Sequence, residues 1–350
     1  MNLFAVRGWS RYAGLALAGA AIAVLFTGPA YLGRGTLNDI WNVAFYVILG
    51  SAWNLMGGLA GQVSFGYSAF MGIGAYATVL LALAGWNAYA TIPVGMAVAA
   101  LFSVIVGLPT FRLRGPYFTI ATIGISEAVR VVAQGFEWTG GSSGKRMPLN
   151  YGDFLYKLLP GVPRGQAIFL ENYYGMLILT VLVVAVVWWV MSSRFGMALA
   201  SIKQDIDAAE ALGVNATGYK VRAHALSAAL VAAAGSLFAI NFQYIAPNSV
   251  FAFNMSLQIV LMPVIGGVGT LLGPVIGGVV FGYIQIKLLT IQALRDSNLM
   301  IYGTLLIVVM LFEPAGILGL LRRLGRLVSR ITSPAAKAAQ PASKGVPNGA

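Results

Sequence analysis

Long apolar segments alternate with short polar ones along most of this chain. A helix that crosses a bilayer needs about 20 mostly apolar residues, and the chain supplies such segments repeatedly. The pattern therefore predicts an all-α, polytopic integral membrane protein with about 8–10 transmembrane helices. The candidate segments are residues 12–31, 37–56, 64–84, 88–110, 116–134, 172–192, 223–245, 255–268, 274–294 and 299–320. The segment 255–268 is short for a full crossing, so a half-helix is the alternative there.

One polar segment, residues 193–222, interrupts this pattern with the sequence SRFGMALASIKQDIDAAEALGVNATGYKVR. Its apolar positions recur at steps of three and four: Leu199, Ile202, Ile206, Ala209 and Leu212. This spacing predicts an amphipathic helix, and Gly213 stands where a left-handed residue would end it. A short charged helix on the Lys- and Arg-rich side of a membrane protein is suited to binding a partner protein. We expect Leu199, Ile202 and Leu212 to be buried in a partner's groove.

Basic residues gather on one side of the predicted topology. Because Lys and Arg accumulate in cytoplasmic loops, residues 112–114, 194–222 and 322–330 should face the cytoplasm. Ten spans put all three on one side, together with both chain termini. Residues 134–171, with Gly, Pro and charges of both signs, then form an external loop. Residues 333–350 are small, polar and Pro- and Gly-rich, which predicts a disordered tail after a membrane domain of residues 1–332.

Composition supports a membrane protein and excludes several kinds of chemistry. Hydrophobic residues make up 59% of the chain and charged residues 9%, whereas a soluble domain is about 25% charged. The net charge of +12 follows from basic residues at segment ends, so it indicates topology and not nucleic-acid binding. With no cysteine and one histidine, His224, the chain has no thiolate or histidine metal cluster and no Cys–His pair. His224 itself is interpreted as a membrane-interface residue.

No enzyme motif emerges. Residues 142–146, SSGKR, lack the upstream glycine and the final Ser or Thr of a phosphate-binding loop. We therefore expect no catalytic residue, no metal and no cofactor on this chain.

Charge inside the spans is scarce. Glu127 and Arg130 are embedded, and their spacing lets them neutralise each other on one helix. The pair is either structural or part of a transport pathway, since embedded charges are commonly functional. An ion-coupled carrier normally needs more intramembrane acids, so that class of transporter is disfavoured.

Neutral polar residues are the other candidates for a pathway. Gln62, Ser64, Thr119 and Thr122 flank or occupy glycine-interrupted spans, where a broken helix would free backbone groups. Together with Glu127 they are the predicted translocation-path residues. The alternative is that these groups only hold helices together, as Ser, Thr and Gln commonly do in membranes.

Glycines cluster in two similar segments, which suggests an internal repeat. The first segment holds Gly57, Gly58, Gly61, Gly66, Gly72 and Gly74, and the second Gly266, Gly267, Gly269, Gly273, Gly277, Gly278 and Gly282. Each begins with a glycine pair and runs into a span that ends in Tyr76 or Tyr283. Such paired interruptions in two halves of a transporter tend to line its substrate path. The alternative role is close helix packing, and the two roles are compatible.

Several motifs carry a family resemblance. They are GQVSFGYSAFMGIGAY at 61–76, RLRGPYFTIATIGISEAVRVV at 112–132, TGG at 139–141, AAEALGVN at 208–215, IGGVGTLLGPVIGG at 265–278 and PAGILGL at 314–320. Together they resemble the membrane permease of branched-chain amino-acid ABC importers, and its LivM type more closely than the shorter LivH type. The resemblance runs from about residue 38 to 320.

The resemblance implies a heteromeric importer in the bacterial plasma membrane. This chain would pair with a LivH-like permease, two cytoplasmic ATPase subunits that bind ATP, and an external solute-binding protein. The polar segment then resembles the family's ATPase-coupling loop, at Asp207, Ala208, Ala209, Glu210, Ala211, Leu212 and Gly213. After TGG this chain departs from its relatives, with residues 142–146 in place of a Gly-Ile pair. A urea or short-chain amide permease of the same architecture is the alternative substrate class.

Overall fold

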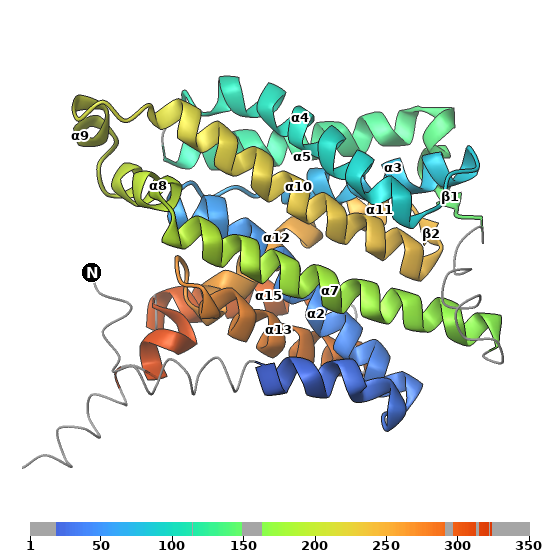
Figure 1. Ribbon diagram of the computed structural model, residues 1–350. Helices are drawn as coiled ribbons and strands as arrows, with labels where there is room; N and C mark the ends of the chain where they lie inside the picture. The colour runs from blue at the N-terminus through green and yellow to red at the C-terminus, as the bar shows by residue number, and fades with distance from the viewer. Residues whose placement is uncertain are drawn as a thin grey trace, which may run out of the picture.

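The computed structural model describes residues 19–113, 115–148, 163–290, 297–312, 315–321 and 323. Helices run between two opposite ends of the molecule, with α8 and α9 at one end and the short strands β1 and β2 at the other (Figure 1). The first half contains η1 Gly28–Ala30, α2 Arg34–Asn54, η2 Leu55–Leu59, α3 Tyr67–Leu83, η3 Tyr89–Thr91, α4 Ile92–Thr110, α5 Pro116–Gly135, η4 Glu137–Thr139, η5 Gly141–Ser143 and β1 Lys145–Arg146. The predicted tail, residues 333–350, lies outside the described residues.

The second half begins with α7, the longest of the described helices. Its elements are α7 Arg164–Ser192, α8 Arg194–Gln204, α9 Ile206–Ala211, α10 Ala216–Phe242, β2 Tyr244–Ile245, α11 Pro247–Val250, α12 Phe253–Gly266, α13 Leu272–Thr290 and α15 Asn298–Phe312. Among the described residues, 6 helices are long and apolar enough to cross a membrane, and three shorter apolar helices accompany them. A helix lies at each of the ten apolar segments identified in the sequence.

Two helices start about two turns earlier than the apolar pattern indicated. α7 begins at Arg164, inside the stretch interpreted as external loop, and α10 begins at Ala216. At α10 the cause is a cap, because the Asn215 side chain accepts a hydrogen bond from the Gly218 amide at 2.8 Å. Polar first turns therefore extend both helices beyond their apolar cores.

The core forms around α10, which packs most extensively on α3 and α4. A Cβ atom at Gly74 would collide with the Ala232 carbonyl, and one at Gly235 with the Met71 carbonyl. The backbones of α3 and α10 are thus in direct contact, as small residues allow in membrane proteins. The predicted packing role of the glycines is confirmed at Gly74.

A second close pair joins α2 to α12 and α13. A Cβ at Gly278 would lie 2.8 Å from the Val47 Cα, and one at Gly50 would lie 2.9 Å from the Met262 Cβ. Of the long apolar helices, the one that contains α2 is accordingly the most buried. The buried share of its apolar stretch is 83%, against 28% for the helices that contain α4 and α7. α2 is therefore an inner helix, and α4 and α7 are peripheral.

The end opposite α8 and α9 is closed by a small antiparallel pair, in which Lys145 faces Ile245 and Arg146 faces Tyr244. The Thr139 hydroxyl donates to the Ala133 carbonyl near the end of α5. Gly140 and Gly141 follow with φ of 85° and 58°, a region that glycine enters without strain. The TGG sequence is thus a helix-ending turn that leads the chain toward β1.

Candidate functional site

The polar segment 193–222 contains two short helices, α8 and α9, in place of one, and its last residues are the first turns of α10. Asp205 is extended, with φ −155° and ψ 116°, and its side chain accepts a hydrogen bond from the Ala208 amide at 3.0 Å. The prediction of a single amphipathic helix was wrong, because an aspartate caps a helix more favourably than it continues one. Gly213 has φ of +86° and ends α9, which confirms its predicted capping role.

The apolar side chains of this segment do not share one surface. Leu199 and Ile202 are 0% and 1% exposed, buried within this chain, whereas Leu212 is 86% exposed. The expectation that all three enter a partner's groove is therefore wrong for Leu199 and Ile202. Of the predicted coupling residues, Ala209 is buried, while Asp207, Ala208, Glu210, Ala211, Leu212 and Gly213 are exposed. What α9 presents outward is Leu212 beside two acidic residues.

The first glycine cluster forms a long helix break, residues 55–66, which we call the first break. α2 passes into the π-helical turn η2, and the chain then runs without helix until α3 begins at Tyr67. Gly61 takes φ of +71°. The Trp53 indole donates to the Ser64 carbonyl at 2.8 Å, which closes the break into a compact loop.

The second glycine cluster forms a short break, residues 267–271, which we call the second break. It separates α12 from α13, and Gly267 and Gly269 take φ of +129° and +78°. The Thr270 hydroxyl accepts from the Gly273 amide at 2.9 Å and so caps the start of α13. Both glycine-rich segments therefore break helices, as the sequence predicted, and they also pack closely.

The two breaks touch through Asn54, a fully buried residue at the end of α2. Its side-chain amide donates to the Thr270 carbonyl at 2.9 Å and its carbonyl accepts from the Gly269 amide at 2.8 Å. No local spacing in the sequence identifies Asn54, because its partners are more than 200 positions away.

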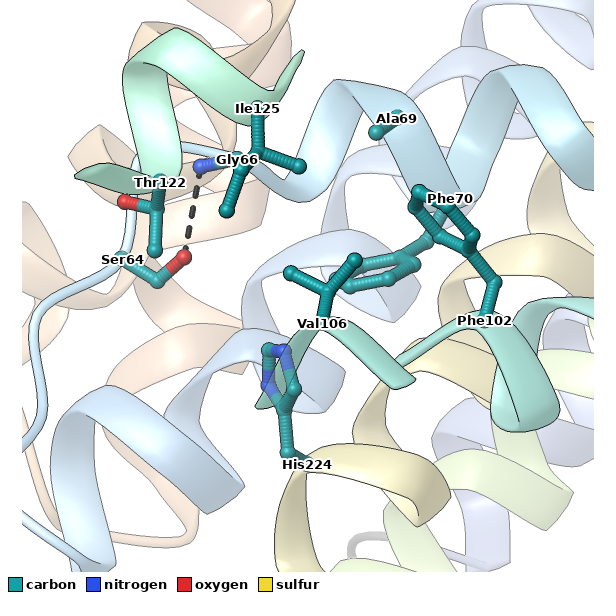
Figure 2. Close-up of a pocket in the computed structure, with 9 residues that line it drawn as sticks. All are labelled: Ser64, Gly66, Ala69, Phe70, Phe102, Val106, Thr122, Ile125 and His224. Atoms are coloured by element: carbon teal, nitrogen blue, oxygen red, sulfur yellow. Dashed lines mark hydrogen bonds between the residues drawn. The ribbon is translucent and has the colours of Figure 1, made fainter. Parts of the chain in front are cut away.

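Three of the predicted path residues lie together where the first break meets α5. The Thr119 hydroxyl donates to the Val63 carbonyl at 2.9 Å, and the Thr122 hydroxyl accepts from the Phe65 amide at 3.2 Å. Ser64 accepts from the Gly66 amide at 3.3 Å (Figure 2). These hydroxyls satisfy backbone groups that the helix break frees. Gln62 lies in the same break, and its side-chain oxygen is buried with no partner among the described residues.

A small pocket opens beside this contact, between α3, α4, α5 and α10 (Figure 2). Ser64, Thr122, His224 and five apolar residues besides Gly66 line it. Its space for a water-sized molecule is about 10 Å³, far below the 300–1,000 Å³ typical of small-molecule sites. In this conformation the pocket is therefore too small for a substrate.

His224 is a buried residue and not a membrane-interface residue, so its interpretation from sequence was wrong. Its ring is 3% exposed. Its ring packs edge to face against the rings of Tyr67, Phe70 and Phe111, and the ring centres are 5.0–5.8 Å apart. Its Nδ1 has no hydrogen-bond partner among the described residues. The aromatic residues of α3 and of the α4–α5 connection bury it, which its position at a helix entry did not reveal.

Among the described residues, Glu127 forms no hydrogen bond with the cluster of Ser64, Thr119 and Thr122 at the first break. It forms an ion pair with Arg130, and its side chain is 47% exposed. Arg130 also donates to the Asn248 side chain at 2.7 Å, which ties α5 to α11. The described residues contain no group of three or more His, Cys, Asp or Glu that could hold a metal ion.

A second hydroxyl cluster lies deeper and was not recognised in the sequence. Ser68 and Ser126 hydroxyls are 2.7 Å apart, and the Ser256 hydroxyl donates to Ser68 at 2.9 Å. All three are buried and come from α3, α5 and α12. They bond to one another, so the cluster fastens three helices together.

Comparison with known proteins places this arrangement in a family. A family profile described as branched-chain amino acid transport system / permease component matches residues 36–310. The LivM permease of the high-affinity branched-chain amino acid transport system from Salmonella typhimurium strain LT2 is 29% identical over 325 residues, covering 87% of this chain and 74% of that protein.

Other relatives match less of the chain or match it less closely. The LivH permease of Escherichia coli strain K12 is 28% identical over 152 residues, covering 43% of this chain and 46% of that protein. The autoinducer 2 import system permease protein LsrC of Escherichia coli strain K12 / DH10B is 24% identical over 311 residues, covering 84% of each chain. No solved structure matches. The chain is a polytopic membrane protein that belongs to the branched-chain amino acid transport permease family, with LivM-type relatives along most of its length.

Proposed function

We propose that this chain is the permease subunit of an ABC importer that moves branched-chain amino acids inward across the bacterial plasma membrane. Its partners are a LivH-like second permease, two cytoplasmic ATPase subunits and an external solute-binding protein. ATP is bound by the ATPase subunits, and this chain carries no ATPase motif of its own. The termini and α8–α9 lie on the cytoplasmic side, and residues 136–148 on the external side.

The observation that carries this proposal is the surface of α9. Leu212, directly after α9, is a large apolar side chain that is 86% exposed. α9 lies at the end of the molecule opposite β1 and β2 (Figure 1). Asp207 and Glu210 are exposed on the same short helix. Burying Leu212 in a groove of an ATPase subunit would stabilise the contact by about 1.5–3 kcal/mol. An apolar anchor flanked by acids thus fits a partner whose groove is rimmed by basic residues.

A substitution at Leu212 tests the docking. In the assembled importer, Leu212→Asp should lower uptake at least about tenfold, because a charge replaces the apolar anchor. Leu212→Met, which keeps size and polarity, should retain uptake. Membrane insertion should be normal for both, since the wild-type residue contacts little of its own chain. Normal uptake and ATPase stimulation with Leu212→Asp would overturn the docking assignment.

The substrate class needs its own test. Uptake of leucine should be inhibited by isoleucine and valine and unaffected by urea or acetamide. Inhibition by urea or acetamide alone would favour the amide-permease alternative. A proton- or sodium-driven flux from this subunit in liposomes would contradict the ABC proposal and favour an ion-coupled carrier.

A further inference from the structure

One lysine of α8 reaches out of its helix to the first break. The Lys203 ammonium donates to the Gly58 carbonyl at 2.8 Å. Its stem crosses Gly61, where a Cβ atom would lie 2.8 Å from the Lys203 Cγ. The absence of a side chain at Gly61 therefore leaves the space in which the lysine lies.

The same ammonium lies beside the second break. A Cβ at Gly269 would lie 3.1 Å from the Gly58 carbonyl oxygen and 3.3 Å from the Lys203 Nζ. Asn54 holds Gly269 and Thr270 against the end of α2 from the other side. Lys203 thus reaches the one point in the described structure where α8 and both helix breaks converge.

Electrostatics favours a cation at this point. Gly58 belongs to η2, the last turn of the helix that begins at Arg34, where carbonyl groups lack helical partners. The negative end of a helix dipole adds to the attraction. Partial desolvation lowers the pKa of Lys203, because its ammonium gives up part of its hydration at this contact while the rest of the side chain stays exposed. The contact to Gly58 offsets that cost with a charge-assisted hydrogen bond.

We propose that Lys203 is a positioning residue that couples α8 to the two helix breaks. While α8 keeps its present place, the lysine holds the first break against the second. A displacement of α8 withdraws the ammonium from Gly58 and loosens both breaks together. This inference rests on the proposed function, in which an ATPase subunit moves the polar segment 193–222.

The lysine is distinct from an ordinary surface cation. A lysine that only seeks water turns its ammonium outward and leaves the stem on the protein. Here the ammonium turns inward to a backbone carbonyl, across a glycine that leaves room for it. Leu199 and Ile202 anchor the preceding turn of α8 in the core, so a movement of the helix displaces Lys203 with it.

The test compares three variants in the assembled importer without nucleotide. Lys203→Met removes the ammonium and keeps the stem, and Lys203→Arg keeps the charge. Gln204→Met introduces methionine at the next residue, which is also exposed. Hydrogen–deuterium exchange is followed in residues 55–66 and 267–271. Lys203→Met should speed exchange about fivefold in both breaks, as the loss of one hydrogen bond worth about 1 kcal/mol predicts. Lys203→Arg and Gln204→Met should stay within about twofold of the wild type.

A second readout addresses coupling. With Lys203→Met, the amount of leucine transported per ATP hydrolysed should fall about fivefold, in proportion to the loosened breaks. Lys203→Gln replaces Lys203→Met if the latter lowers the yield of assembled protein. Unchanged exchange in either break overturns the inference, and so does faster exchange with unchanged transport per ATP. Failure of the Leu212 test would overturn the ATPase docking alone, because exchange in the breaks does not depend on where the ATPase binds.

Discussion

The two helix breaks share a glycine-rich sequence and differ in construction. The first is a π-helical turn followed by seven residues without helix, and hydroxyls of α5 satisfy part of its backbone. The second is five residues long and is closed by its own Thr270 and by glycines packed backbone to backbone. A repeated sequence pattern has therefore produced one open break and one tight break. The first break therefore relies on hydroxyls of another helix, whereas direct backbone contacts hold the second.

The largest effect should come from adding a methyl group at the last residue of α12, immediately before the tight break. A Cβ at Gly266 would collide with the Gly273 carbonyl. Gly266→Ala should therefore lower the free energy of unfolding by about 3 kcal/mol or more, since neither backbone can yield. The measurement is the thermal unfolding midpoint of the purified protein. Gly124→Ala in α5 is the control, because a Cβ there meets nothing within 4 Å; equal midpoints for both variants would refute a rigid second break.

Removal of the bridge between the breaks should have the next largest effect. Asn54→Ala leaves the Gly269 amide and the Thr270 carbonyl without these partners in a buried site. The expected loss is about 1–3 kcal/mol of unfolding free energy. Asn42→Ala on the same helix is the control, because Asn42 bonds only to Asn38 one turn away. A loss no larger than that of the control would show that the two breaks are independent.

The smallest stability effect is expected in the open break. Thr119→Val removes the hydrogen bond to Val63 and should cost about 0.6 kcal/mol, the average for interhelical bonds in membranes. Thr119→Val should lower uptake by more than the small loss of folded protein explains, because it changes the contact between the first break and α5. An uptake rate that falls no further than the amount of folded protein would favour a purely structural role for Thr119.

Cysteine labelling distinguishes residues that line the transport path from residues that only hold helices together, and this chain has no native cysteine to interfere. Ser64→Cys and Thr119→Cys should react with a water-soluble thiol reagent faster during ATP turnover than at rest. Thr78→Cys, at a fully buried position of α3, is the unreactive control. If neither test cysteine is labelled in either state, these residues do not line the path.

The sequence predicted those features that depend on neighbouring residues. Apolar runs located the helices, and glycine clusters located both breaks, because each pattern acts over a few positions. The division of the polar segment at Asp205 was missed because the apolar spacing from Leu199 to Leu212 continues across it and does not reveal that its carboxylate caps a second helix. The burial of Leu199 was missed because an amphipathic pattern does not tell whether the chain itself or a partner covers the apolar face.

Long-range contacts were beyond such reasoning. Lys203 and Gly58 are separated by 145 positions, and nothing in the spacing of either segment indicates the other. Ser68, Ser126 and Ser256 are likewise far apart in the sequence, and nothing in the spacing of their helices indicates that they meet. The chemistry of these residues is ordinary, and only the packing of the helices gives them partners.

The bridge at Asn54 also has a consequence for the order in which the protein is made. The partner of its side-chain carbonyl, Gly269, lies 215 positions later in the chain. At a synthesis rate of about 5–20 residues per second, that partner follows about 10–40 s after Asn54 leaves the ribosome. Until then the amide needs water or another temporary partner. The first break therefore reaches its final form only after about three-quarters of the chain has been made, so truncation before Gly269 should leave even the early helices unfinished.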